Sequence, residues 1–235
     1  MILLIEWSDW ETPFLAGGNT YMYDYFEDKE FLRRAQSLCS SIAKATEEYA
    51  REYGVIGQVF LVGSGGRNMI TRDGTSPIDF DYNFNVIKCE DWHKCMQIKE
   101  AVRKAFNKAM RDEKLRDVQD STSSLTSYPI YFEDTPEVKF SIDIGIVTMD
   151  NDGNWHRLIH QKYGNIYNDP YIWNEVRHSK GLKEKTKRLK ENNYWPLVRD
   201  IYLEKKNKYK GDDEHPSFIC FIEAVNEAHQ KCFRK

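Results

Sequence analysis

The sequence is poor in cysteine and has no long apolar run, and these absences exclude two classes of protein. Its five cysteines are an odd number without a Cys-x-x-Cys pair, which argues against a disulfide framework. No stretch approaches the roughly 20 apolar residues that span a bilayer, and the run at 2–5 is better explained as a strand or a packed arm. The first residues also lack a basic leader. We therefore expect a reduced, cytoplasmic protein with no membrane contact.

The chain also lacks a strong charge of either sign. Its 34 basic and 37 acidic residues give a net charge of -3, so no global field draws it toward nucleic acid or an anionic membrane. A hydrophobic content of 40% over 235 residues is enough for a buried core and excludes a disordered chain. No internal repeat or low-complexity tract is present.

What is present is a set of three aspartates in apolar, strand-like surroundings. Asp79 and Asp81 alternate with apolar residues from Ile78 to Phe84, and Asp143 does the same between Phe140 and Ile146. Because side chains alternate between the two faces of a strand, each run projects its acids from the face opposite its apolar residues. Carboxylates about 4 Å apart repel by roughly 4 kcal/mol per pair at an effective dielectric near 20. The three acids therefore need shared protons or a cation, and oxygen ligands favour Mg²⁺ or Mn²⁺ over zinc.

The apolar periodicity predicts helices and strands in a definite order. It favours a long helix over 27–53, a strand over 58–62, a glycine turn at 63–66, a polar loop over 67–77 and the acidic strand over 78–87. A helix follows, with Asp91 as its N-cap and its end near Glu113. Strands are predicted over 123–132, 137–148 and 155–160, and the chain after Tyr171 is predicted to be helical, with a last helix over 217–232. We therefore predict an α+β fold, a mixed sheet flanked by helices, divided into a core at 1–163 and a helical C-terminal lobe at 164–235.

The glycine turn and the acids together resemble the signature of the polymerase-β-like nucleotidyltransferase superfamily. This superfamily includes CCA-adding enzymes, aminoglycoside nucleotidyltransferases and the oligoadenylate and cyclic-dinucleotide synthetases. The resemblance covers roughly 58–148, and it consists of Gly63-Ser64, Asp79-x-Asp81 and Asp143. In that family the Gly-Ser turn grips the terminal phosphates of a nucleotide, which implies nucleotide contacts from Gly63 and Ser64.

The resemblance also assigns the acids, as ligands of two metal ions. It implies that Asp79 and Asp81 bind both metals and that Asp143 binds the catalytic metal beside the attacking hydroxyl. One departure is the 14 residues between Ser64 and Asp79, a longer spacing than the family usually has. A second is Pro77, where many relatives have Ser or Asp. The nucleotide-binding prediction extends to Gly65 and Arg67, although Arg67 and Arg72 are also explained as solvated loop cations.

Other polar residues are less specific. The basic series from Lys180 to Lys190 is explained either as an exposed helix face or as a wall for triphosphate or RNA. Several tyrosines are candidates for stacking on a base, although core packing explains them as well. The histidines show only His156-x3-His160, which falls in a predicted strand, so we expect no zinc site. The tyrosines concerned are Tyr128, Tyr131, Tyr163, Tyr167 and Tyr171.

These observations predict a magnesium- or manganese-dependent nucleotidyltransferase that moves a nucleoside monophosphate from an NTP to a hydroxyl and releases pyrophosphate. The acceptor is open: a small molecule, an RNA end, a protein side chain or a second nucleotide all present one hydroxyl oxygen. One alternative is a cyclic-dinucleotide or oligonucleotide synthase. Another is a non-catalytic module of the same fold that binds nucleotide or RNA.

Overall fold

The computed structural model describes residues 22–163, 169–176, 181–212 and 215–234. The predicted arm at 2–5 and Tyr167 lie outside these residues. The helices are α1 (Lys29–Ala50), α2 (Cys95–Asp112), α3 (Leu182–Glu191), α4 (Trp195–Lys208) and α5 (Ser217–Phe233), with short 3₁₀ turns at Arg51–Tyr53 and Gly65–Arg67. The strands are β1 (Tyr23–Tyr25), β2 (Ile56–Leu61), β3 (Thr71–Asp73), β4 (Ile78–Lys88), β5 (Gln119–Asp120), β6 (Leu125–Thr126), β7 (Ile130–Phe132), β8 (Thr135–Met149), β9 (Trp155–His160) and β10 (Tyr171–Glu175).

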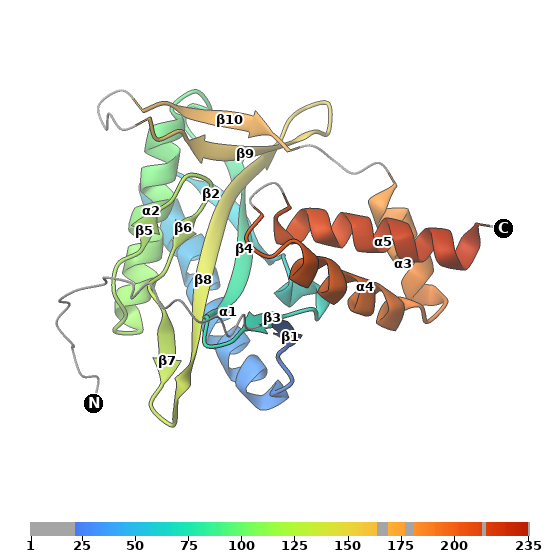
Figure 1. The fold of residues 1–235 in the computed structure, drawn as a ribbon. Helices are drawn as coiled ribbons and strands as arrows, with labels where there is room; N and C mark the ends of the chain where they lie inside the picture. Colours follow the sequence, from blue (N-terminus) through green and yellow to red (C-terminus); the bar gives the residue numbers. More distant parts are fainter. Residues whose placement is uncertain (1–21, 164–168, 177–180, 213–214, 235) are drawn as a thin grey trace.

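The main sheet is mixed, as the sequence predicts. Its strand order is β10-β9-β8-β4-β2, and the short strands β6 and β7 pair with β8. The central pair β4 and β8 is parallel, whereas β2 and β9 run antiparallel to their neighbours. Helices α1 and α2 lie side by side along this sheet (Figure 1). The predicted α+β class, a mixed sheet flanked by helices, is confirmed.

The apolar side of β4 and β8 is buried against α1 and α2. Phe80, Phe84 and Phe140 are fully buried in the main hydrophobic cluster, together with Ile42 of α1 and Phe106 of α2. Helix α1 begins where the Asp28 carboxylate accepts a hydrogen bond from the backbone N–H of Phe31 at 2.9 Å. Since neighbouring residues of a strand alternate, burial of this face leaves the aspartates of β4 and β8 on the other one.

The C-terminal helices form a second hydrophobic cluster beside the sheet. Leu189 of α3, Ile201 of α4 and Val225 of α5 are buried within it, and Figure 1 shows the three helices grouped to one side of the β4 and β8 strands. Met69, which follows the glycine turn, is buried in the same cluster. The predicted division at residue 163 stays a prediction. Met69 lies before that point in the sequence, but its side chain packs with the C-terminal helices. In the described parts of the chain, no helix has the length and apolar character needed to cross a membrane.

Two predictions about secondary structure were wrong. The chain at 171–175 is strand β10, not helix, because its aromatic and β-branched residues pair along the outer edge of β9. Asp91 does not cap α2. Its carboxylate accepts from the N–H of His93 in a local turn at 2.9 Å, and the helix starts at Cys95.

Two predicted segments are also more divided than expected. The predicted strand over 123–132 is split into β6 and β7, with Pro129 between them, because proline has no N–H to donate to a sheet. The predicted loop over 67–77 contains β3, which pairs with β1 in a separate two-stranded ribbon. This ribbon contacts the C-terminal lobe: the side-chain amide of Asn207 exchanges hydrogen bonds with the backbone of Tyr23 at 2.6 and 3.0 Å.

Candidate functional site

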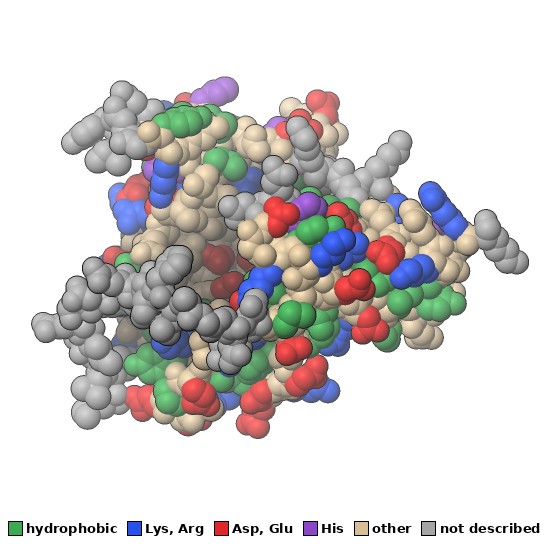
Figure 2. Space-filling model, in the orientation of Figure 1, with side chains coloured by type: hydrophobic (Ala, Val, Ile, Leu, Met, Phe, Trp, Pro, Cys, Tyr) green, Lys and Arg blue, Asp and Glu red, His purple; other side chains and the backbone are tan. Residues whose placement is uncertain are grey.

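The parallel pairing of β4 with β8 brings the three predicted acids together. Asp81 is directly opposite Asp143, and Asp79 is opposite Ser141. The Ser141 hydroxyl donates to Oδ1 of Asp79 at 2.5 Å, which fixes that carboxylate on the polar face of the sheet. Figure 2 shows acidic side chains at the floor of a hollow between the sheet and the C-terminal helices.

The electrostatics of the acids show that they share one environment. The pKa of Asp143 is raised from 3.8 to about 6, mainly by burial and also by the charges of Asp79 and Asp81, against a hydrogen bond with Thr126. The pKa of Asp81 is also raised, first by burial and then by Asp79. Oδ1 of Asp143 is buried without a hydrogen-bond partner. A negative group in this state is stabilised by a cation or a proton.

These acids are not arranged as a closed set of ligands. Among the described residues, no group of three or more Asp, Glu, His or Cys side chains is placed so that it could hold a metal ion. The acids nevertheless have the chemistry that a divalent cation requires, because they are oxygen donors and one of them has an unsatisfied buried oxygen. The donor chemistry of these residues therefore fits a hard divalent cation, whereas the placement of their side chains is not that of a complete ligand set.

The glycine turn lies directly against Asp81. The N–H of Val62 donates to the backbone oxygen of Asp81 at 2.8 Å, so the chain enters the turn beside the acid. Gly63 has φ +59°, and a Cβ built at this position would lie 2.0 Å from Oδ2 of Asp81. Only glycine allows the backbone to approach the carboxylate this closely.

Ser64 and Gly65 form the start of the next turn. The backbone oxygen of Ser64 accepts from the N–H groups of Arg67 and Met69, at 3.2 and 2.9 Å, which orders the turn as a 3₁₀ helix beginning at Gly65. The Ser64 hydroxyl makes no capping hydrogen bond within this 3₁₀ helix. The predicted phosphate-contacting residues Gly63, Ser64 and Gly65 therefore form one ordered turn next to Asp81.

The two predicted loop arginines have structural contacts. Arg67 donates to the backbone oxygen of Gly63 at 2.6 Å, and its guanidinium carbon lies 4.3 Å from the centre of the Phe221 ring of α5. It thus connects the glycine turn to the C-terminal lobe. Arg72 donates to the backbone oxygens of Ser76 and Glu137, at 3.1 and 2.9 Å, and holds β3 to the start of β8.

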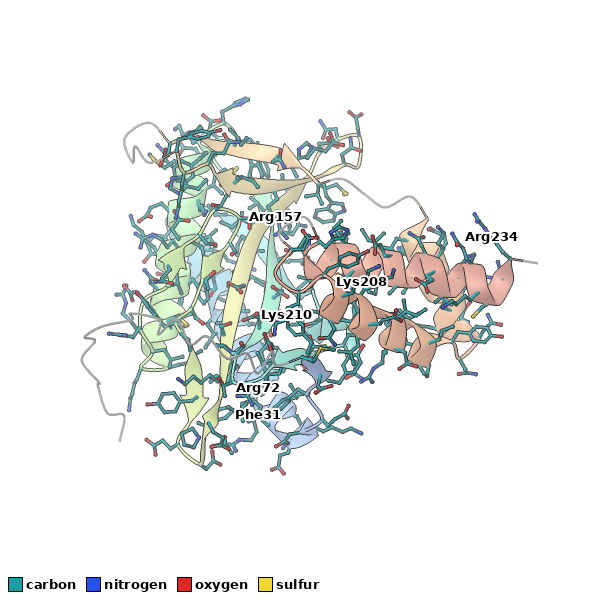
Figure 3. The ribbon with its side chains drawn as sticks, viewed as in Figure 1. Phe31, Arg72, Arg157, Lys208, Lys210 and Arg234 are labelled. Atoms are coloured by element: carbon teal, nitrogen blue, oxygen red, sulfur yellow. The ribbon has the colours of Figure 1, made fainter. Side chains whose placement is uncertain are left out.

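Sequence reasoning missed three cations around the sheet, and the charges of two of them, Lys206 and Arg157, act on Asp81. Lys206 of α4 donates to Oγ1 of Thr71 at 2.8 Å; burial lowers its pKa, and the charges of Asp79 and Asp81 are among those that raise it. Lys210 is paired with Asp73 at 2.8 Å, and Figure 3 shows it between the C-terminal helices and the sheet. Arg157 of β9 is the third. The lysine-rich composition near residue 206 was visible, but helical spacing alone does not identify the side chain that faces an acid on another element.

The other predicted polar features contact residues of their own surroundings. On α3, Lys185 donates to the side chain of Asn226 at 2.7 Å, and Arg188 lies over the Phe233 ring at 4.0 Å. Tyr171 stacks on His160, with ring centres 4.0 Å apart, and the guanidinium of Arg116 lies 5.2 Å from the Tyr128 ring. These contacts favour the structural explanation of these residues.

Comparison with known proteins shows the fold. No protein-family model matches the chain, and no curated protein matches its sequence. Among solved structures, the Vibrio cholerae DncV cyclic AMP-GMP synthase in complex with the linear intermediate pppA(3′,5′)pG aligns with 85% of this chain and 68% of its own, at a TM-score of 0.55 and 9% identity. The Bradyrhizobium diazoefficiens CD-NTase CdnG in complex with GTP aligns with 85% of this chain and 66% of its own, at a TM-score of 0.53 and 12% identity.

A third neighbour is the STING-associated CdnE c-di-GMP synthase from Capnocytophaga granulosa, with a TM-score of 0.53, 13% identity, and coverage of 84% of this chain and 59% of that one. The chain thus spans about two thirds of the length of these structures. The chain shares its fold with these cyclic-dinucleotide synthases and with CdnG, so the fold that the sequence resemblance implies is confirmed.

Proposed function

We propose that this protein is a metal-dependent nucleotidyltransferase that moves a nucleoside monophosphate from an NTP to a hydroxyl acceptor and releases pyrophosphate. The observation that carries the proposal is the register of β4 and β8, which sets Asp81 opposite Asp143 while Gly63 lies against Asp81. A phosphate-binding turn and three acids on one sheet face are the parts that phosphoryl transfer requires. The structural neighbours, two of which were solved with nucleotide or a nucleotide product, support the proposal.

The proposed metal ligands are Asp79, Asp81 and Asp143, and the ion is Mg²⁺ or Mn²⁺, with two ions as the family resemblance implies. The unsatisfied buried Oδ1 of Asp143 supports this assignment. When bound, the metal supplies charge that stabilises the triphosphate and lowers the pKa of the attacking hydroxyl.

The chain's own residues would position the reactants. The turn at Gly63 and Ser64 would hold the terminal phosphates, with Arg67 fixing the shape of the turn through the backbone oxygen of Gly63. Lys206, which belongs to the C-terminal lobe, would offset the charge of the triphosphate. Asp143 would orient the acceptor hydroxyl for in-line attack on the α-phosphorus, so that the new O–P bond forms as the bond to the pyrophosphate oxygen breaks.

Two alternatives differ in acceptor and in catalysis. A cyclic-dinucleotide or oligonucleotide synthase is favoured by the structural neighbours, which are described as such synthases. A non-catalytic module that binds nucleotide or RNA would instead bind in a strongly salt-dependent way that is indifferent to Asp143→Asn.

The test is incubation of the purified protein with each α-labelled NTP and Mg²⁺ or Mn²⁺, with and without a cell extract. Label in a nucleotide product without extract identifies a synthase. Label in an extract component identifies another acceptor. Loss of all transfer in Asp143→Asn would assign the activity to this site. An absence of metal-dependent transfer in every reaction would contradict the proposal.

Binding provides a readout that does not require turnover. Mg²⁺ plus NTP at about 100 times the dissociation constant should stabilise the wild-type protein by about 2.7 kcal/mol, which is about 5 to 10 °C in Tm for a chain of this size. The shift should be much smaller for Asp81→Asn, because that variant lacks one of the carboxylates that would hold the metal. Asp117→Asn, on a surface ion pair with Arg111, is the control. Equal shifts in the wild-type and Asp81→Asn proteins would count against metal-bridged nucleotide binding.

Lys206→Ala should weaken the binding of the donor nucleotide. Because Lys206 is partly buried and influenced by the charges of Asp79 and Asp81, its removal should raise KM for Mg-NTP about 10-fold or more with a smaller change in kcat. Lys208, on the exposed side of α4, is the matched control, and Lys208→Ala should behave as wild type. Steady-state kinetics decide, and equal kinetics of the two variants would remove Lys206 from the site.

A further inference from the structure

The chain that follows α2 returns to the sheet as the short antiparallel pair β5 and β6, and this hairpin lies against Asp143. Thr126 of β6 is directly opposite Asp143 of β8, on the edge of β8 that does not pair with β4. Figure 1 shows β5 and β6 between α2 and β8. Residues opposite each other in an antiparallel pair project from the same face of the sheet. Asp143 therefore has Asp81 on one side and Thr126 on the other.

The Thr126 hydroxyl holds one oxygen of Asp143. The hydrogen bond between Thr126 and Asp143 lowers the pKa of Asp143, as expected when a hydroxyl donates to a carboxylate. Oδ1 of Asp143 has no hydrogen-bond partner, so the bond from Thr126 is made to the other carboxylate oxygen. Carboxylates that bind metals are commonly held in this way by a second hydrogen-bonding group. Oδ1 is left for a cation.

Two serines continue this hydrogen bond away from the acids. The Ser124 hydroxyl lies 3.3 Å from Oγ1 of Thr126 and 2.8 Å from the Ser121 hydroxyl, which also donates to the backbone oxygen of Ser124 at 3.1 Å. A hydroxyl has one proton to donate. Since Thr126 gives its proton to Asp143, Ser124 donates to Thr126, and Ser121 donates to Ser124. In this hydroxyl chain, Ser121–Ser124–Thr126, all three donors point toward the carboxylate.

A buried cation lies at the far end of the hydroxyl chain. Lys99 of α2 is only 3% exposed, and its ammonium group donates to the backbone oxygen of Ser121 at 2.7 Å and is paired with Asp120 at 2.6 Å. Nδ1 of His160 on β9 lies 2.8 Å from Oδ2 of Asp120. The start of the hairpin is therefore fixed to both α2 and β9. Hydrogen bonds in a series polarise one another, which strengthens each of them.

The hydroxyls are not needed to close the hairpin. The backbone closes its turn, because the N–H of Ser121 donates to the backbone oxygen of Ser124 at 3.1 Å. The end of β6 is held to β8 by Ser127, whose hydroxyl accepts from the N–H of Ile142 at 3.0 Å. Replacement of the Thr126 hydroxyl should therefore leave the fold intact and change the orientation of Asp143.

We infer that Thr126 is a positioning residue for Asp143, and that the hydroxyl chain, anchored at Lys99, fixes this carboxylate for the proposed divalent cation. The inference rests on the proposed function and deepens it, because it names groups outside the three acids that determine the affinity for the metal. In this role the hydroxyls act through Asp143 rather than through contact with the metal or the nucleotide.

Thr126→Val is the direct test, because valine keeps the β-branched shape and removes the hydroxyl. With a non-hydrolysable NTP analogue present, the affinity for Mn²⁺ should fall about 10-fold or more, measured from the free-ion signal in electron paramagnetic resonance. Thr126→Ser keeps a hydroxyl and should restore most of the affinity. Thr122→Val is the matched control: Thr122 is exposed in the same hairpin, and this variant should bind Mn²⁺ as wild type does.

Ser124→Ala interrupts the hydroxyl chain one step away from the acid. It should weaken Mn²⁺ binding by a smaller factor than Thr126→Val, because Thr126 keeps its own bond to Asp143. Without metal, the Tm of either variant should change by less than about 4 °C. At low Mn²⁺ the kcat of Thr126→Val should fall, and it should recover as Mn²⁺ is raised, since a loss of affinity is overcome by more ligand.

The outcomes separate this inference from the proposed function. If Thr126→Val binds Mn²⁺ as tightly as the wild-type protein, its hydroxyl has only a structural role and the inference is wrong. The inference is also wrong if Thr122→Val weakens binding equally, or if added Mn²⁺ does not restore kcat. If Thr126→Val does not fold, Ser124→Ala decides, and unchanged Mn²⁺ binding in it would overturn the role of the hydroxyl chain. If the wild-type protein binds no Mn²⁺ with the analogue present, the proposed function itself fails.

Discussion

Asp143→Asn should reduce nucleotidyl transfer by at least about 1,000-fold while leaving the ligand-free protein as stable as wild type or more stable. The loss follows from the proposed role, because an amide cannot replace a carboxylate that binds the metal beside the attacking hydroxyl. The stability follows from the pKa of Asp143, which burial and then the charges of Asp79 and Asp81 raise to about 6. The folded protein disfavours the charge that the substitution removes.

The sign of the pH dependence follows from the same shift. A carboxyl whose pKa is raised on folding contributes stability below its unfolded value of 3.8, and this contribution is lost as the pH rises through about 6. The Tm of Asp143→Asn minus that of wild type should therefore be near zero at about pH 4 and reach its largest positive value above pH 6. Thermal melts without metal, at intervals from pH 4 to 8, measure this difference.

Asp79→Asn extends the test to a second acid. It should also abolish transfer, and it should lower the pKa of both Asp81 and Asp143, since Asp79 raises each of them. Asp117→Asn, at an exposed ion pair on the far end of α2, is the control for a general effect of removing a carboxylate. A loss of several kcal/mol of stability without metal, in either Asp79→Asn or Asp143→Asn, would identify that acid as a structural partner and refute the assignment.

The sequence predicted the acids because strand alternation is a local property. Alternation along β4 assigns Asp79 and Asp81 to one face, and alternation along β8 does the same for Asp143. That these strands are adjacent and parallel, with Asp81 opposite Asp143, is a tertiary fact. The sequence analysis predicted only that the acids share one site, and the pairing and register of the two strands come from the structure.

The cations could not be predicted in the same way. Lys206 comes from a helix that follows all three acids in the sequence, 125 residues after Asp81 and 63 residues after Asp143. Its orientation depends on how the C-terminal lobe packs against the β1–β3 ribbon. Neither strand of that ribbon was predicted, since three residues are too few for a periodic signal. Arg157 lies in a strand that was predicted. Its contact with Asn83, however, crosses β8 and depends on the absence of a side chain at Gly145, which is opposite Asn83 on β8. Sequence periodicity finds faces of single elements, whereas these contacts depend on the spacing between elements.

Gly63→Ala should be the most damaging substitution outside the acids, with transfer reduced by about 100-fold or more. Two effects add at this position. The φ of +59° costs a residue with a side chain about 1 to 2 kcal/mol. The new Cβ would also lie 2.0 Å from Oδ2 of Asp81, so the carboxylate or the whole turn must move. Either movement separates the proposed phosphate-binding turn from the proposed metal ligand.

Gly54→Ala separates these two effects. Gly54 has φ +80°, in the same left-handed region, but no atom lies within 4 Å of where its Cβ would be. This variant should therefore lose a similar amount of stability to backbone strain while it keeps wild-type kcat and KM. Urea unfolding and steady-state transfer, measured on both variants, provide the comparison. If the two variants lose transfer equally, backbone strain explains the effect, and the contact between Gly63 and Asp81 has no part in catalysis. If Gly63→Ala alone loses transfer, the turn must be in contact with Asp81 for the reaction to proceed.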